Sequence, residues 1–248
     1  MDDATLYARM LANMEAFFAS DPAHTFRRPG VVGALCPLIP HRSVFNSVTY
    51  RDPAALRDAL PDLAAAYDEA GVLAWTVWTP AEHTEARAAL AAAGHVLDAT
   101  PQAMAAPLAE IDVADGAAGL DWERATGVDD MCQVLEEAFG WERGPTVEVM
   151  AGLEQIGHVY VAHLDGAPVA CVAAFDAGGD CGIYNVGTRA VARGRGLATG
   201  LMRQAALDAR ARGCETTSLQ ATAMGRPIYR RLGYRDLGVI EMWERRRT

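Results

Sequence analysis

The chain has 248 residues, of which 51% are hydrophobic and 22% are charged, and its formal net charge at pH 7 is -10. This composition is typical of a soluble globular protein with one or two domains and enough apolar residues to form a core. The acidic balance argues against a general nucleic-acid binder or a protein held on anionic membranes, because both need surplus basic residues, and no apolar run reaches the length of a membrane span.

The cysteine pattern predicts a reduced, cytoplasmic protein without a structural metal. The five cysteines are odd in number, and they show neither C-x-x-C spacing nor a companion cluster of histidines. The chain starts Met1-Asp2-Asp3, which does not resemble a secretory signal. Because the cysteines and histidines do not cluster, the sequence predicts no metal ligands.

The N-terminal half alternates predicted strands and helices. Residues 3–20 carry apolar side chains at helical spacing, and Arg27-Arg28-Pro29-Gly30 then breaks the chain. The elements that follow are a strand at 45–50, a helix at 52–69, a strand at 72–78, a helix at 82–93 and an extended segment at 95–108.

A linker rich in Pro, Gly and acidic residues at 107–119 predicts a boundary between two domains, 1–115 and 116–248. The C-terminal half repeats the order of strands and helices, so the N-terminal half is interpreted as a degenerate copy of the same fold. Its helix at 52–69 starts beside Asp52, whose carboxylate would repel a phosphate. We expect a structural or substrate-shaping half, and pairing of two copies through it into a homodimer stays an alternative.

The second half opens with a strand at 120–126 and two helices, at 129–139 and 145–156. A hairpin at 158–164 and 169–175 follows, with the strong turn dipeptide Asp165-Gly166. Because His158 and His163 occupy even and odd positions of one strand, they face opposite ways and do not jointly bind a metal.

A glycine-rich turn leads from the next strand, 181–186, into a helix that starts at Leu197 and stops at Gly213. The first amides of a helix lack internal partners and carry partial positive charge. Gly194 and Gly196 keep side chains away from those amides, and Arg193 and Arg195 add formal charge. This pattern predicts a pyrophosphate site.

Two common nucleotide motifs do not fit this turn. A P-loop would end in Gly-Lys-Ser/Thr, which is absent. A dinucleotide motif would need G-x-G-x-x-G, but Thr199 stands at the third glycine position and Gly200 comes one residue late. A different pyrophosphate ligand is therefore favoured.

The turn instead reads R-x-x-G-x-A at Arg193, Gly196 and Ala198. Downstream, a strand at 216–222 precedes a short helix that bears Tyr229 and ends Leu232-Gly233-Tyr234. Together these motifs resemble the GCN5-related N-acetyltransferase (GNAT) family, over about residues 119 to 246.

The resemblance implies an α/β fold with a mixed central sheet, in tandem with the degenerate N-terminal half. It implies acetyl-CoA as acyl donor, a primary amine as acceptor and no metal. The residues that it assigns to acetyl-CoA are Val186, Gly187, Thr188, Arg193, Gly194, Arg195, Gly196, Leu197, Ala198 and Thr199. The resemblance also implies a splayed or bulged strand near Val186-Gly187-Thr188, and Gly187 suits such a bulge because glycine is frequent at these irregularities.

Tyr229 matches the position where the family often places a tyrosine near the CoA sulfur, and its ordinary pKa near 10 keeps it protonated as an acid. The general base stays open among Glu136, Glu137, Asp180, Tyr184 and a water chain. A small-molecule acceptor is favoured over a protein. A non-catalytic acyl-CoA-binding sensor or scaffold is the alternative function.

Overall fold

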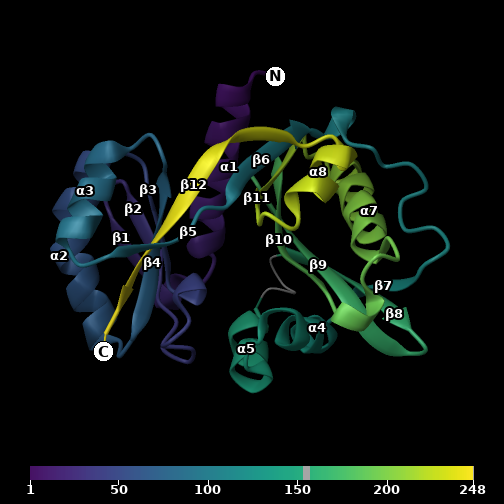
Figure 1. Cartoon of the computed structure of the whole chain (residues 1–248), viewed down its shortest axis with the longest axis horizontal. Helices are drawn as coiled ribbons and strands as arrows, with labels where there is room; N and C mark the ends of the chain where they lie inside the picture. The colour runs from purple at the N-terminus through teal and green to yellow at the C-terminus, as the bar shows by residue number, and fades with distance from the viewer. Residues whose placement is uncertain (153–156, 248) are drawn as a thin grey trace. The chain divides into compact units, whose positions relative to one another are not determined.

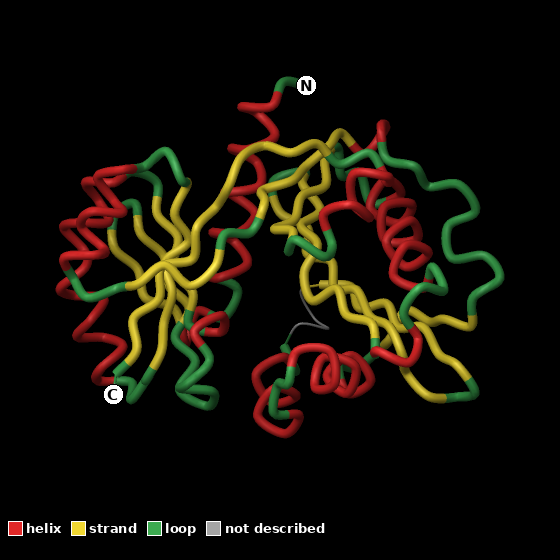
Figure 2. Tube along the Cα trace, in the orientation of Figure 1, coloured by secondary structure: helices red, strands yellow, loops and turns green. Residues whose placement is uncertain are grey.

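The computed structural model describes residues 1–152 and 157–247. Over these residues the chain is a mixed α/β protein whose strands pair in both directions, as the sequence predicts (Figures 1 and 2). It divides into two compact units, each built from several stretches of chain. The first contains Met1–Asn13, Met104–Leu219 and Gly225–Asp236, and the second contains Met14–Ala103, Gln220–Met224 and Leu237–Thr248. None of the helices in the described ranges is both long and apolar enough to cross a membrane.

The first unit is built on a sheet with the strand order β6-β11-β10-β9-β8-β7. Strands β7 to β10 are consecutive antiparallel neighbours, whereas β10 and β11 run parallel. The strands are β6 (Gln102–Pro107), β7 (Asp121–Ala125), β8 (Gly157–Leu164), β9 (Ala167–Ala177), β10 (Asp180–Thr188) and β11 (Thr216–Ala221). The helices are the start of α1 (Asp3–Phe18), α4 (Asp129–Phe139), α5 (Arg143–Met150), α7 (Leu197–Ala211) and α8 (Arg226–Leu232), with 3-10 turns at Leu108–Glu110 and Ala190–Ala192.

Helices α4 and α7 cover opposite faces of this sheet (Figure 1). On β8, the Tyr160 hydroxyl donates to Asp208 of α7 at 2.9 Å, whereas His163 lies 3.3 Å from Asp130 of α4. Positions 160 and 163 point to opposite faces because side chains alternate along a strand. The hairpin turn is the predicted one, with Asp165 and Gly166 both at positive φ. The tail of the predicted helix 145–156, residues 153–156, lies outside the described residues.

The second unit has the strand order β1-β2-β3-β4-β12, and β5 also pairs with β12. The parallel strands β3 and β4 are joined by α2, as the predicted strand and helix order requires. Leu56, Leu63 and Tyr67 of α2 pack into a core with Val48 and Val77 of the two strands. The elements are β1 (Thr25–Arg28), β2 (Val31–Ala34), β3 (Ser47–Tyr50), α2 (Pro53–Glu69), β4 (Ala74–Pro80), α3 (Thr84–Ala92), β5 (Val96–Ala99) and β12 (Arg235–Arg246), with 3-10 turns at Pro22–His24 and Ser43–Phe45.

Strands β1 and β2 form a hairpin where the sequence predicts only a break at Arg27-Arg28-Pro29-Gly30. Arg28 pairs with Val31, so Pro29 and Gly30 form the turn, and Gly30 has φ +74°. Because β1 ends in two consecutive exposed arginines, its sequence lacks the alternation of apolar and polar residues that predicts a half-buried strand. The break is therefore a turn between two short strands.

The compact units differ from the predicted division into 1–115 and 116–248. Strand β12 pairs with β4 from Ile240 opposite Pro80 to Arg246 opposite Ala74, so the end of the chain belongs to the second unit. Residues 1–13 belong to the first unit, and the division near the linker falls between Ala103 and Met104. An alternating pattern predicts a strand but not its partner, and this pairing spans more than 150 residues of sequence.

His95, at the start of β5, is a buried histidine in an apolar setting. Its side chain is 3% exposed, and neither ring nitrogen has a hydrogen-bond partner among the described residues. The ring meets Trp75 edge-on, with centroids 4.5 Å apart. Burial, helped by the nearby positive charge of Arg245, lowers the pKa of His95 to about 4.

This pKa predicts an acid-sensitive second unit. In the unfolded chain His95 has its ordinary pKa of 6.5. Between pH 6.5 and pH 4, therefore, His95 is protonated in the unfolded chain but neutral in the folded chain. Between pH 7 and pH 4.5 the free energy of unfolding should fall by roughly 2 to 3 kcal/mol more in the wild type than in His95→Phe. Urea unfolding followed by tryptophan fluorescence measures this difference, in which carboxylates common to both proteins cancel. An equal fall in the free energy of unfolding of the two proteins would contradict the lowered pKa of His95.

Candidate functional site

The start of α7 is open and has no side-chain cap. Gly194 and Gly196 both have φ +77°, and a Cβ added to either would meet nothing within 4 Å. Gly196 is the N-cap, and the first intrahelical bond runs from Gly200 N to the Gly196 carbonyl at 2.9 Å. The amides of residues 197–199 are therefore left without intrahelical partners, at the positive end of the helix dipole. This is the environment that a pyrophosphate requires.

The two arginines of the loop have different settings. Arg193 is exposed, but its Nε donates to the Thr188 carbonyl at 3.2 Å and so ties the loop to the end of β10. Arg195 is exposed and forms no ion pair within the described part of the chain. Arg195 is thus the loop cation that remains available to a bound anion.

Strands β10 and β11 separate soon after they begin. Their pairing covers only Asp180 to Gly182, opposite Thr216 to Ser218. On its other side β10 stays paired with β9 as far as Thr188, with a register shift between Tyr184 and Gly187. Asn185, within this shift, has φ +52°. The irregularity lies at 185–186, at the start of the predicted Val186-Gly187-Thr188 segment. Beyond Gly182, the edge of β10 that faces β11 is unpaired.

Gly187 packs closely against α4. A Cβ there would lie 3.2 Å from Leu135 Cδ2, 3.2 Å from Val134 Cγ1 and 3.3 Å from Cys171 Sγ. Its φ is not in the left-handed region; the left-handed residue of the bulge is Asn185. The predicted bulge near Val186-Gly187-Thr188 corresponds to a register shift between Tyr184 and Gly187. Asparagine is among the few non-glycine residues that adopt positive φ readily.

Tyr229 lies on α8 with 9% of its surface exposed. Burial raises its pKa to about 12. Its ring meets Tyr234 at 6.0 Å between centroids, and its hydroxyl has no hydrogen-bond partner among the described residues. Gly225 lies under the ring, since a Cβ there would come within 2.8 Å of Tyr229 Cε2. The role of Gly225 depends on this contact with a residue of α8 and is not predicted by any local sequence pattern.

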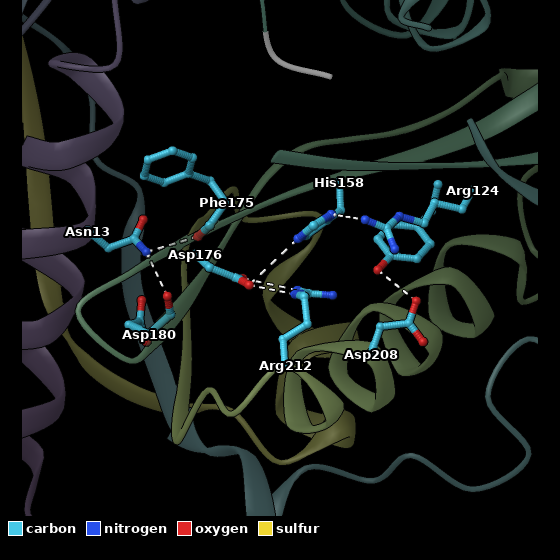
Figure 3. A network of polar contacts seen from close by, with 9 residues as sticks. Asn13, Arg124, His158, Phe175, Asp176, Asp180, Asp208 and Arg212 are labelled. Carbon is cyan, nitrogen blue, oxygen red and sulfur yellow. Dashed lines mark hydrogen bonds and ion pairs between the residues drawn. The ribbon is translucent and has the colours of Figure 1, made fainter. Parts of the chain in front are cut away.

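Two of the four predicted base candidates are held in buried networks. The Asp180 carboxylate, 1% exposed, accepts from Thr216 Oγ1 at 2.7 Å and Ser218 Oγ at 2.6 Å, and burial raises its pKa. Asn13 donates to the carbonyls of Asp180 and Phe175 (Figure 3). The Tyr184 hydroxyl donates to Asn13 Oδ1 at 2.8 Å, and burial raises its pKa well above the ordinary value. Asp180 is roughly 20 Å along β10 from Gly187.

The two glutamates of α4 differ in their availability. Glu137 forms a two-point ion pair with Arg189, at 2.7 Å and 2.6 Å. Glu136 is exposed and makes no ion pair with any described residue. Of the four candidates, Glu136 is the one that is neither buried nor engaged.

A second polar network lies on the α7 side of the sheet (Figure 3). Arg212, just past α7, forms a two-point ion pair with Asp176 of β9 at 2.6 Å and 3.0 Å. His158 of β8 contacts the same carboxylate at 3.7 Å, and burial lowers its pKa. These contacts fasten the end of α7 to the strands, and His158 contributes to them through Asp176.

Residues 155–236 match the family model described as Acetyltransferase (GNAT) domain. The whole chain is similar to a GCN5-related N-acetyltransferase from Kribbella flavida, with a TM-score of 0.64 and 20% identity over 93% of this chain and 95% of that one. A GCN5-related N-acetyltransferase from Sphaerobacter thermophilus gives 0.60 and 19% identity, over 88% and 76% of the two chains. A tandem GNAT protein from the clavulanic acid biosynthesis pathway gives 0.57 and 14%, over 87% and 78%. No curated protein sequence matches the chain closely enough to count as a relative.

These comparisons confirm the predicted resemblance and the predicted fold. The matched segment contains β9, β10, α7, β11 and α8, and so includes the glycine loop and Tyr229. The similarity to solved structures extends over residues of both units, which agrees with the predicted tandem arrangement. At these identities the solved structures establish the fold alone.

The setting of Asp180 predicts that it is not the base. Asp180→Asn keeps the shape of the side chain and one acceptor oxygen, so the acyl-transfer rate at saturating substrates should stay within about threefold of the wild type. The measurement is thiol release with each substrate saturating. A loss of a hundredfold or more, without a change in the circular dichroism spectrum, would instead make Asp180 the proton acceptor.

Proposed function

Because residues 155–236 match the GNAT acetyltransferase family model, we propose that the protein transfers an acetyl group from acetyl-CoA to a primary amine, most simply that of a small molecule. The observation that carries the proposal is the uncapped start of α7, with two left-handed glycines, directly after a strand that has left its parallel neighbour. The donor, the acceptor and the roles of single residues are parts of this proposal.

Acetyl-CoA would bind along one continuous stretch of chain. The amides of Leu197, Ala198 and Thr199 would donate to the pyrophosphate, and Arg195 would add charge. The unpaired edge of β10 from Val186 to Thr188 would offer backbone groups to the pantetheine arm and to the thioester carbonyl. Direct transfer then requires only that the acceptor amine reach the thioester carbon where β10 and β11 have separated.

Tyr229 would assist the departing sulfur as a hydrogen-bond donor. A thiol ionises near pH 8.5, about three pKa units below the raised value of Tyr229. Complete proton transfer from this tyrosine to a thiolate is therefore uphill, whereas a hydrogen bond to the developing negative charge is favourable and needs no loss of the proton. An unengaged hydroxyl is free to make that bond.

The charges of α4, α5 and the loop between them favour a cationic acceptor. In this family these helices usually form the acceptor side of the cleft. Residues 129–150 hold a single arginine, Arg143, and six carboxylates: Asp129, Asp130, Glu136, Glu137, Glu142 and Glu148. Such a field concentrates positively charged small molecules near the site. An amine must lose a proton before attack, and Glu136 or a water chain would take it.

The compartment and the assembly complete the proposal. All five cysteines are free, and free thiols persist in the cytoplasm, where we place the protein. Association of two copies through residues 1–115 remains a prediction that sedimentation would decide.

A non-catalytic acyl-CoA-binding module is the second candidate. It is favoured by the engagement of Asp180, Tyr184 and Glu137 in other contacts, which leaves one of the four predicted bases available. Such a module would bind acetyl-CoA without thiol release for any amine. The chain contains no lysine, so transfer to its own lysines cannot imitate turnover in this assay.

Blocking the start of α7 should abolish acetyl-CoA binding. The indole of Gly196→Trp would fill the space in front of the amides, and calorimetric titration should show at least a hundredfold weaker binding than wild type. Gly213→Trp is the matched control, because Gly213 follows the other end of α7, has φ +90° and also has nothing within 4 Å of an added Cβ. Both substitutions place a side chain at positive φ, so equal losses, or no binding by wild type, would overturn the proposed donor site.

Removing the Tyr229 hydroxyl should slow transfer without weakening donor binding. For Tyr229→Phe we expect a 10- to 100-fold lower kcat and an unchanged Kd for acetyl-CoA. Tyr234→Phe serves as control, since the Tyr234 hydroxyl is already paired with Thr217 at 2.9 Å, and its loss should lower Tm but spare kcat. An unaffected kcat in Tyr229→Phe would leave this tyrosine a packing residue.

A further inference from the structure

Three metal-ligating side chains from three elements converge on the α4 face of the first unit's sheet. They are Glu123 of the edge strand β7, Asp130 in the first turn of α4 and His163 of β8. Their ligand atoms all lie within 4.8 Å of one another. In the antiparallel pairing Glu123 is opposite Val161, two residues before His163, so Glu123 and His163 share a face.

One pair within the cluster has the separation expected of two ligands of one ion. His163 Nε2 and Asp130 Oδ2 are 3.3 Å apart, longer than the roughly 2.7 to 2.9 Å of a charge-assisted hydrogen bond. Two ligands at about 2.0 to 2.1 Å from a tetrahedral Zn²⁺ lie about 3.3 Å from each other. The Glu123 carboxylate, which is exposed, has room to complete the set.

The charges of the cluster are not otherwise balanced. Within the described part of the chain, neither Glu123 nor Asp130 forms an ion pair with an arginine, and the chain has no lysine. Two carboxylates and one imidazole therefore face each other without a cation, whereas Asp112 is paired with Arg203 and Asp236 with Arg226. A divalent ion would remove the repulsion between the carboxylates.

We propose that Glu123, Asp130 and His163 bind one Zn²⁺, whose remaining positions are filled by water. Imidazole nitrogen and carboxylate oxygen are both ligands of this ion in proteins. The ion joins β7, α4 and β8, so its role is to fasten the edge of the sheet to α4. This inference does not rest on the proposed acyl transfer.

The proposed site differs from the sequence-based expectation of no metal ligands. That expectation compares the histidines with each other, and His158 and His163 do face opposite sides of the sheet. The ligand set needs only one histidine, because the carboxylates come from two other elements. No fixed sequence spacing connects these three positions.

The test is titration of metal-free, untagged protein with Co²⁺, followed by displacement with Zn²⁺. Wild type should bind one equivalent of Co²⁺ with visible bands of nitrogen and oxygen ligation and without the intense near-ultraviolet band of a thiolate ligand. Glu123→Gln and His163→Gln should each weaken binding at least tenfold. His24→Gln is the control, because His24 pairs with Asp21 at 2.7 Å but has no third ligand, and it should bind as wild type.

Three results would overturn the proposal: no saturable binding, a thiolate band that accounts for the bound cobalt, or unchanged affinity in Glu123→Gln. Since Glu123 is exposed and its replacement is isosteric, this variant should fold as wild type and decides the matter if His163→Gln does not fold. A rise in Tm with Zn²⁺ in wild type and control, absent from Glu123→Gln, gives independent support.

Discussion

Strands β10 and β11 run parallel but hydrogen-bond only over their first three residue pairs, and the site depends on this early separation. Further along β10, a register shift against β9 and the left-handed Asn185 interrupt the regular ladder. Beyond the shift, β10 is supported by β9 on one side and by α4, which packs against Gly187. The unpaired edge and the free amides of α7 then belong to one stretch of chain, 183–199.

The two units use the same strand, helix and strand order with opposite electrostatics. In the second unit β3 and β4 also pair over a short distance, from Ser47 to Val48. There the helix start is closed, because the Asp52 side chain accepts from the Ala55 amide at 2.9 Å. In the first unit Gly196 leaves the start of α7 without such a cap. The second unit thus caps its helix with the Asp52 carboxylate, whereas the helix start in the first unit is open to an anion from solution.

Features encoded by neighbouring residues could be predicted from the sequence. The glycine loop, the Asp165-Gly166 turn and the helix end at Gly140 follow from local backbone preferences, and each is present. The partner of β12, the contacts of Asn13 and the convergence of Glu123, Asp130 and His163 depend on segments far apart in sequence. Asn185 could have drawn attention as a residue that tolerates positive φ, but the sequence does not say that the bulge lies there.

The central claim is that the backbone amides at the start of α7 bind the pyrophosphate of acetyl-CoA. Hydrogen exchange of the amides in residues 194–199, measured with and without acetyl-CoA, tests it most directly. Donation to the phosphates should slow their exchange at least tenfold, while residues 213–217 past the other end of α7 keep their rates. Unchanged exchange at 194–199 under saturating acetyl-CoA would contradict the account.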